Sequence, residues 1–495
     1  MSQETFVDLD SVRRRLADSS GRRYWKSLEE LAATPGFQSF LEREFPQQAS
    51  EWSDPNGRRD FLRIMGASLA LAGLTACTRQ PEETIVPYVK SPEQVVPGRP
   101  LFFATSVLDH GLAKGVLVES HLGRPTKIEG NPDHPASLGA TDVFGQAAIL
   151  GLYDPDRSQT ITHRGEVRTW GAFLSAMEPA LAAQKALSGA NFRILTEAVT
   201  SPTLAAQIQA LLAAYPEAKW HQYQPVSADN ARGGAQLAFG EPVAAQYRLA
   251  EADVILSLEA DFLGSGPANV RLIREFAERR RIEGEQAHLN RLYVVEGSPS
   301  ITGAAADHRL PLRSSEIEGV ARAVASGLGL AVEGASKQQA AWVGPLIEDL
   351  QKHAGRCLVL AGESQPAAVH ALAHAINAQL GNLGKTVVYT APVEARPTDQ
   401  QASLKDLVAD MAASKVSLLL ILGGNPVYNA PADVPLLSAL DQVPVRVHLG
   451  LYQDETAERC HWHLPEAHSL ESWGDARAFD GTASIVQPLI APLYG

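Results

Sequence analysis

Apolar runs of strand length alternate with longer stretches of helical periodicity from about residue 101 onward. Residues 254–258 form one such run, and in the segment 270–281 Leu272, Ile273 and Phe276 share one side of a helix. The same pattern predicts further strands and helices at 115–119, 125–130, 291–295, 357–361, 367–380, 386–389, 404–413 and 416–422. Such alternation is typical of parallel sheets covered by helices, so we expect an α/β fold.

The length of the chain and the changes in its pattern predict several domains. A chain of 495 residues is too long for one core, so about three folded domains are expected. Aromatic residues and leucines at helical spacing mark the first part, and the proline-rich segment 78–100 has the composition of an extended tether. The expected divisions are a helical extension at 1–54, a signal segment at 55–77, a small α/β domain with its tether at 78–160, and α/β domains at 161–335 and 336–495.

A pair of arginines precedes a short apolar stretch and a cysteine. Arg58 and Arg59 lead into the 13 mainly apolar residues 64–76, and Cys77 follows. Because a membrane span takes about 20 residues, this pattern favours a twin-arginine export signal with a lipoprotein cleavage site. A buried core helix that follows two arginines is the alternative. A Cys77 with two or more acyl chains would hold the protein on a membrane. We therefore expect an exported protein, associated with the periplasmic face of the cytoplasmic membrane.

Composition restricts the partners and the metal chemistry. The net charge of −13 disfavours nucleic acid as a partner, because phosphate binding needs basic patches. The three cysteines, Cys77, Cys357 and Cys460, are too few for a disulfide framework or for the usual iron–sulfur cluster with four thiolates. No apolar run approaches the length of a membrane span, so membrane contact would come through lipid or through partners.

An ordered set of short motifs follows the tether. The motifs are 123–135 (GRPTKIEGNPDHP), 152–157 (LYDPDR), 252–256 (ADVIL), 306–313 (ADHRLPLR), 423–426 (GGNP), 454–457 (DETA) and 463–466 (HLPE), and then Glu471, Gly474 and Gly481. In this order they resemble the molybdopterin-dependent oxidoreductases of the dimethyl sulfoxide reductase type, over roughly residues 101–490. The resemblance implies multi-domain parallel sheets covered by helices, without the C-terminal domain of that fold.

Departures from the family pattern argue against its redox centres. Active members carry a cysteine cluster for a [4Fe–4S] centre, but the corresponding segments 102–111 and 139–146 contain no cysteine. The molybdenum ligand would lie near residues 195–235, where Ser201 and Asp229 are available but nothing singles either out. We therefore expect no molybdenum, no bound molybdopterin and no catalytic residue in this chain.

Two loops are candidates for contact with a dinucleotide. Gly423, Gly424 and Asn425 follow a predicted strand, where glycines would let the backbone approach a ligand. The alternative, which we favour, is a structural turn kept as a vestige after the cofactor was lost. In the equivalent earlier loop, the carboxylates of Glu259 and Asp261 would repel a pyrophosphate.

Two further clusters have a chemical and a structural interpretation. Cysteine and histidine are zinc ligands, but residues 460–463 (CHWH) on a strand would place only His461 and His463 on one face. We favour a buried strand and expect no metal site. Asp133 and His134 could form an acid–base pair, but the flanking asparagine and prolines favour a turn.

The N-terminal extension narrows the resemblance. The segments 24–31 (YWKSLEEL) and 42–46 (EREFP), followed by 49–52 (ASEW) and the paired arginines, resemble the molybdopterin oxidoreductases with a variant twin-arginine signal. These are the large iron–sulfur subunits of alternative complex III, a bacterial membrane quinol oxidase. The resemblance implies a molybdopterin-like half without cofactor, followed by a ferredoxin-like half that holds the clusters. The chain would then be a fragment or one half of a split subunit.

Three hypotheses of function follow. The first is a non-catalytic, lipid-anchored scaffold of a respiratory complex that oxidises quinol and reduces a cytochrome c or similar acceptor. Its expected partners are a cluster-bearing ferredoxin-like domain, a multihaem cytochrome and polytopic membrane subunits. The second is an exported molybdopterin-dependent oxidoreductase acting on a small anion or a sulfur compound. The third is a freestanding lipoprotein binding module. The sequence leaves open the electron acceptor, the quinone and the docking surfaces.

Overall fold

The computed structural model describes residues 95–282, 289–334 and 339–494. The chain divides into two compact units, Met1–Ser91 and Pro92–Gly495, and the described residues all belong to the second. None of the helices in this described part combines the length and the apolar character needed to cross a membrane.

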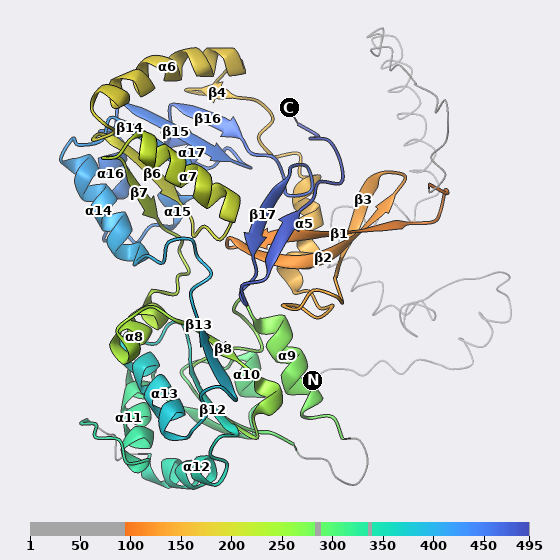
Figure 1. Cartoon of the computed structure of the whole chain (residues 1–495), viewed down its shortest axis with the longest axis vertical. Helices are drawn as coiled ribbons and strands as arrows, with labels where there is room; N and C mark the ends of the chain where they lie inside the picture. Colours follow the sequence, from red (N-terminus) through yellow and green to blue (C-terminus); the bar gives the residue numbers. More distant parts are fainter. Residues whose placement is uncertain (1–94, 283–288, 335–338, 495) are drawn as a thin grey trace, which may run out of the picture. The chain divides into compact units, whose positions relative to one another are not determined.

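The larger parallel sheet combines strands from distant parts of the sequence (Figure 1). From edge to edge, its strands are β5 (Glu166–Val167), β4 (Thr162–His163), β16 (Trp462–Pro465), β15 (Val445–Gly450), β14 (Leu418–Leu422), β6 (Phe192–Thr196) and β7 (Lys219–Gln222). The five strands from β16 to β7 are parallel, whereas β4 pairs antiparallel to β16 and β5 pairs antiparallel to β4. Their carboxyl ends therefore lie along one edge of the sheet.

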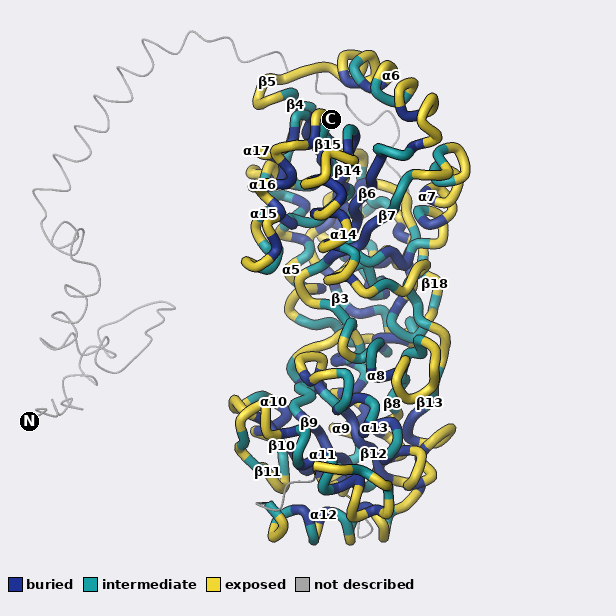
Figure 2. Tube along the Cα trace, turned by 90° about the vertical axis from the view of Figure 1, so that its left-hand side faces the viewer, coloured by how far each residue is buried: buried dark blue, intermediate teal, exposed yellow. Residues whose placement is uncertain are grey.

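Helices cover both faces of this sheet. Leu419 and Ile421 of β14 pack with α14 (Gln400–Ala412) and α16 (Leu436–Leu440), whereas Leu418 packs with α7 (Pro202–Ala214). A further helix, α6 (Trp170–Ala186), packs on β15 and β16 and keeps much of its surface exposed (Figure 2). Burial on both faces explains why the central strands are nearly continuous apolar runs.

The smaller sheet is entirely parallel. Its strands, in spatial order, are β11 (His308–Pro311), β10 (Arg291–Glu296), β9 (Val254–Leu258) and β12 (Cys357–Ala361). The helices α11 (Ile317–Gly327), α12 (Ala340–Lys352) and α13 (Ala367–Gln379) pack on one face. The helix α9 (Asn269–Glu278) and the antiparallel pair of β8 (Ala244–Tyr247) and β13 (Val387–Thr390) pack on the other.

The remaining elements are smaller. An antiparallel sheet of β1 (Leu101–Asp109), β2 (Leu112–His121) and β3 (Arg124–Gly130) packs with α5 (Val143–Leu152), and β17 (Gly474–Arg477) pairs with β18 (Ala483–Val486). Short helices are α8 (Asp229–Phe239), α10 (Ile301–Ala304), α15 (Pro426–Asn429) and α17 (Glu455–Arg459), with 3-10 turns at Leu249–Glu251 and Ser314–Glu316. The Thr105 hydroxyl of β1 donates to the Gln487 carbonyl at 2.9 Å and accepts from its amide at 2.8 Å, so the end of β18 is tied to β1.

The predicted elements agree with the structure more closely than the predicted pairings. The strands expected at 254–258 and 357–361 are β9 and β12, and the helix expected at 270–281 is α9, which ends at Glu278. The strand expected at 386–389 is β13, but its predicted place in a parallel sheet is wrong because it pairs antiparallel to β8.

Both parallel sheets take strands from either side of the expected division at 335/336. The strands β6 and β7 pair beside β14, and β12 pairs beside β9. The division therefore does not separate the two sheets, because these pairings join segments that are far apart in the chain.

Candidate functional site

Loops at the carboxyl ends of parallel strands are where ligands bind in open α/β sheets. In the larger sheet, Glu197 follows β6, the loop of Gly423, Gly424 and Asn425 follows β14, and Glu466 follows β16. This edge therefore brings together the glycine-rich loop that the sequence singled out and two carboxylates from other strands.

Internal contacts hold the glycine-rich loop. Gly423 and Gly424 both have φ of 72°, a left-handed conformation that strongly favours glycine. The Asn425 side chain donates to Glu455 at 2.7 Å and accepts from the Thr456 hydroxyl at 2.8 Å, so it fastens the loop to α17. These are the contacts of a structural turn, and they occupy the polar groups of Asn425.

A directed chain of hydrogen bonds passes beside this loop. Nε2 of His448 lies 3.3 Å from the Gly424 carbonyl, and Nδ1 of His448 lies 3.1 Å from Nδ1 of His463. Nε2 of His463 lies 2.5 Å from the Ser158 hydroxyl. A carbonyl can only accept, so His448 donates through Nε2, His463 donates to His448, and Ser158 donates to His463. Burial lowers the pKa values of both rings, and for His463 burial followed by the adjacent His448 lowers the pKa to about 4, which favours the neutral forms that this assignment of donors requires.

Carboxyl groups near the edge have raised pKa values. Burial, followed by the charge of Glu197, raises the pKa of Glu466 to about 7. Burial also raises the pKa values of Glu197 and Glu363, while His110 partly opposes each rise. Glu363 follows β12 of the smaller sheet, and both Glu363 and Glu466 remain accessible to solvent although protein atoms surround them. The region around Glu197, Glu363 and Glu466 therefore holds several carboxyl groups, and it is poorly suited to bind an anionic ligand.

In the smaller sheet, the carboxylate of Glu259 lies among the loops that follow the strands. It accepts from the Gly297 amide at 3.1 Å, from the Ser314 hydroxyl at 2.5 Å and from the Gln365 side chain at 2.5 Å. The Asp261 carboxylate accepts from the amide and hydroxyl of Thr302 at 2.9 and 2.7 Å. These two half-buried side chains, which the sequence marked as repelling a pyrophosphate, accept hydrogen bonds from neighbouring loops.

Comparison with known proteins addresses the fold. The chain is 14% identical in sequence to acetylene hydratase from Pelobacter acetylenicus, with a TM-score of 0.57 over 79% of this chain and 67% of that one. The chain has a molybdopterin-oxidoreductase-like fold. This is the α/β architecture with parallel sheets, of the dimethyl sulfoxide reductase type, that the motifs predicted.

A curated relative has a similar sequence. The chain is 25% identical over 433 residues to the menaquinone reductase, molybdopterin-binding-like subunit, of Nitratidesulfovibrio vulgaris. The match covers 77% of this chain and 61% of the relative, so it spans less than two thirds of the relative's length. No family model matches the chain.

The two side chains that the sequence offered as molybdenum ligands, Ser201 and Asp229, make contacts within the protein. Ser201 caps α7 by accepting from the Leu204 amide at 3.0 Å, and it also contacts Asp475. Asp229 accepts from the Gln400 amide and from Arg232. Both side chains that could have served as molybdenum ligands are thus engaged in structural contacts. The segment 102–111, in β1 and the following turn, offers no thiolate for a cluster.

The other two candidate clusters have structural contacts. The Asp133 amide donates to the Asn131 side chain and the His134 amide to the Asn131 carbonyl, which confirms the predicted turn. Trp462 packs against Phe173 on one face of β16, and His463 faces His448 on the other, as expected for a strand. Cys460 lies in the core with α14 and α16, where burial raises its pKa to about 12. A thiol of this kind is a poor metal ligand.

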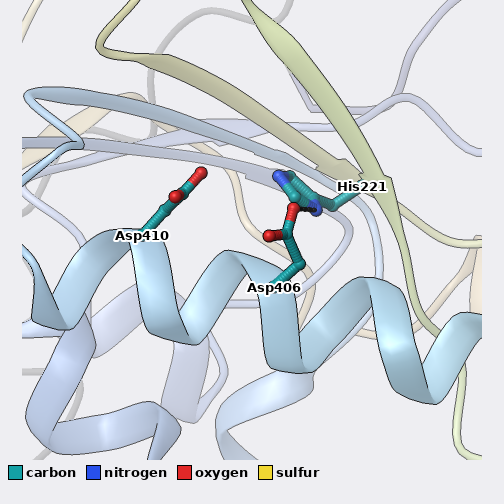
Figure 3. A group of neighbouring side chains, drawn as sticks. All are labelled: His221, Asp406 and Asp410. Atoms are coloured by element: carbon teal, nitrogen blue, oxygen red, sulfur yellow. Dashed lines mark ion pairs between the residues drawn. The ribbon is translucent and has the colours of Figure 1, made fainter.

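Sequence reasoning missed a cluster on β7 and α14 (Figure 3). His221, Asp406 and Asp410 offer ligand atoms within 4.8 Å of one another. However, Lys219 lies 2.7 Å from Asp410 and 3.2 Å from Asp406, and Arg193 lies 2.8 Å from Asp410. Two cations already balance the two carboxylates, so the cluster has no net negative charge to attract a metal ion. Asp406 and Asp410 lie 185 and 189 residues after His221 in the sequence, so no local spacing indicates the cluster.

His448 and Glu197 were also not singled out from the sequence. His448 lies in the second half of β15 and Glu197 directly follows β6, and this place near the carboxyl end of a buried parallel strand is the signal that could have identified them. Arg58 and Arg59, predicted to belong to an export signal, and Cys77, predicted to be lipidated, lie outside the described residues.

Proposed function

We propose that this chain is the molybdopterin-oxidoreductase-like scaffold portion of a membrane quinone oxidoreductase of the alternative complex III type. It carries no molybdenum cofactor and no catalytic residue of its own. The similarity to a menaquinone reductase subunit supports a place in a quinone-linked complex. Quinol oxidation as the direction of electron flow rests on the resemblance of the N-terminal segments.

The observation that carries the proposal is the contact set of Glu259. Its carboxylate takes the hydrogen-bond donors of the loops at the carboxyl ends of the smaller sheet, where a dinucleotide would approach this type of fold. The engaged side chains of Ser201 and Asp229 and the acidic region around Glu466 support the same conclusion. Without a cofactor or cluster ligands, the role left for this region is to hold other subunits in place.

Export and lipidation complete the proposal. Arg58 and Arg59 direct the folded protein across the membrane, and acylated Cys77 holds it at the periplasmic face. The partners are a ferredoxin-like domain that carries iron–sulfur clusters, a multihaem cytochrome and polytopic membrane subunits. Electrons would move through those partners.

Purification from membranes tests this assignment. Mild detergent should extract the chain together with a cytochrome, a cluster protein and polytopic subunits, and the extract should oxidise quinol. Mass spectrometry should find an acylated N-terminal Cys77. Recovery of the chain alone would favour a freestanding binding module, and an unmodified peptide that runs through residues 70–85 would contradict cleavage at Cys77.

A further inference from the structure

The Glu259 carboxylate connects the loops that follow all four strands of the smaller sheet. Glu259 itself follows β9, Gly297 follows β10, Ser314 follows β11, and Gln365 follows β12. Gly297 donates to Oε1, whereas Ser314 and Gln365 donate to Oε2. The Ser364 hydroxyl lies 3.4 Å from the same oxygen, Oε2. One anionic group therefore receives donors from every other loop on this edge.

The donors to Glu259 are of the kind that binds oxyanions. They are a backbone amide, a hydroxyl and a carboxamide, so the described hydrogen bonds to this carboxylate come from neutral groups. Neutral donors that converge at the carboxyl ends of parallel strands hold phosphates in α/β proteins. Gln365 is only 1% exposed, and its side-chain nitrogen also donates to the Ser314 hydroxyl at 3.0 Å, so the carboxylate, the hydroxyl and the carboxamide form one connected cluster.

The backbone at Glu259 adds a second observation. Glu259 has φ of 57°, which is uncommon for a residue with a side chain. A Cβ atom at Gly362 would lie 1.9 Å from the Glu259 carbonyl oxygen, so the loop after β12 packs directly on this peptide. A glycine would fit the left-handed conformation without strain. The presence of glutamate at such a position indicates that its side chain has a specific task.

We propose that Glu259 is a built-in anion that fills an oxyanion site, and that removal of its side chain opens this site to a small oxyanion such as phosphate or formate. The inference rests on the proposed function in one respect: it takes the chain to bind no anionic cofactor at the carboxyl ends of these strands, so that Glu259 supplies the negative charge there. The carboxylate replaces the ligand and joins the four loops permanently.

The test uses the purified full-length protein and the substitution Glu259→Gly. Glycine suits the backbone, so a loss of stability reports the missing carboxylate rather than strain. The midpoint of thermal unfolding should fall by about 3 °C or more. Phosphate or formate in the tens of millimolar, roughly tenfold above a millimolar Kd, should restore at least half of that loss. The same salts should leave the unsubstituted protein unchanged.

Controls separate anion binding from salt effects. Chloride at equal ionic strength should not restore the midpoint, and Glu278→Ala, which removes an exposed carboxylate paired with Arg274, should show neither the loss nor the rescue. An unchanged midpoint in Glu259→Gly, or a loss that phosphate and formate leave in place, would overturn the inference. Neither result bears on the proposed function, which is decided by the cofactor content of the unsubstituted protein.

Discussion

At the scale of single residues, a buried ion pair joins two motifs that lie far apart in the chain. Arg157, at the end of the motif 152–157, donates to both oxygens of Glu471 at 3.1 and 2.6 Å. The two side chains are 2% and 0% exposed. The structure thus gives a physical reason for both motif residues, which the sequence showed only as an ordered pattern.

Replacement of Arg157 should be strongly destabilising. Arg157→Met leaves Glu471 as an uncompensated buried charge and should lower the free energy of unfolding by about 3–5 kcal/mol in urea titrations. The matched control is Arg168→Met, which breaks an exposed pair with Glu166 and should cost less than about 1 kcal/mol. Equal losses in the free energy of unfolding for the two substitutions would contradict a larger contribution of the buried pair.

Glu466 should make stability depend on pH near neutrality. Its pKa is raised to about 7 in the folded protein, first by burial and then by Glu197, from an ordinary value of 4.5. The folded state binds the proton more tightly, so the contribution is complete below about pH 4.5 and is lost as pH rises through about 7. Glu466→Gln mimics the protonated form and should reduce the fall in thermal midpoint between about pH 5 and about pH 8. A fall as large as in the unsubstituted protein would contradict the raised pKa, and Glu278→Gln, at a surface carboxyl group paired with Arg274, serves as the control.

At the scale of elements, the Asn377 side chain pairs with backbone groups of β12, the outermost strand of the smaller sheet, that no neighbouring strand reaches. Asn377 on α13 accepts from the Val359 amide at 3.0 Å and donates to the Val359 carbonyl at 2.6 Å, beside the edge strand β12. Asn377→Leu would leave both backbone groups buried and unpaired, so it should cost about 2–4 kcal/mol in urea unfolding. Gln379→Leu, on the exposed side of the same helix, should cost much less. A comparable loss for both would show that Asn377 contributes only through its helix.

Local elements could be predicted from the sequence, but contacts between distant segments could not. The run at Val254–Leu258 is continuously apolar because both faces of β9 are covered, and its bounds were predicted correctly. In contrast, β8 is short and half-buried, so its antiparallel pairing with β13 leaves no clear pattern. Glu259 was recognised as unfavourable for a pyrophosphate, but its donors lie 38, 55 and 106 residues away, beyond any local spacing.

At the scale of the whole molecule, the type of fold suggests a cofactor, whereas the contacts of the candidate site residues do not. The chain has a molybdopterin-oxidoreductase-like fold. Within this fold, the side chains of Ser314, Ser201 and Asp229 are engaged by hydrogen bonds to other parts of the protein. The scaffold function proposed above is consistent with both observations.

The content of molybdenum and pterin in the purified full-length protein tests this central claim most directly. Elemental analysis combined with fluorescence of oxidised pterin should find neither at a level that approaches one per chain, also when the protein is purified within its membrane complex. Stoichiometric molybdenum with bound pterin would contradict the scaffold assignment and favour an exported molybdopterin-dependent oxidoreductase.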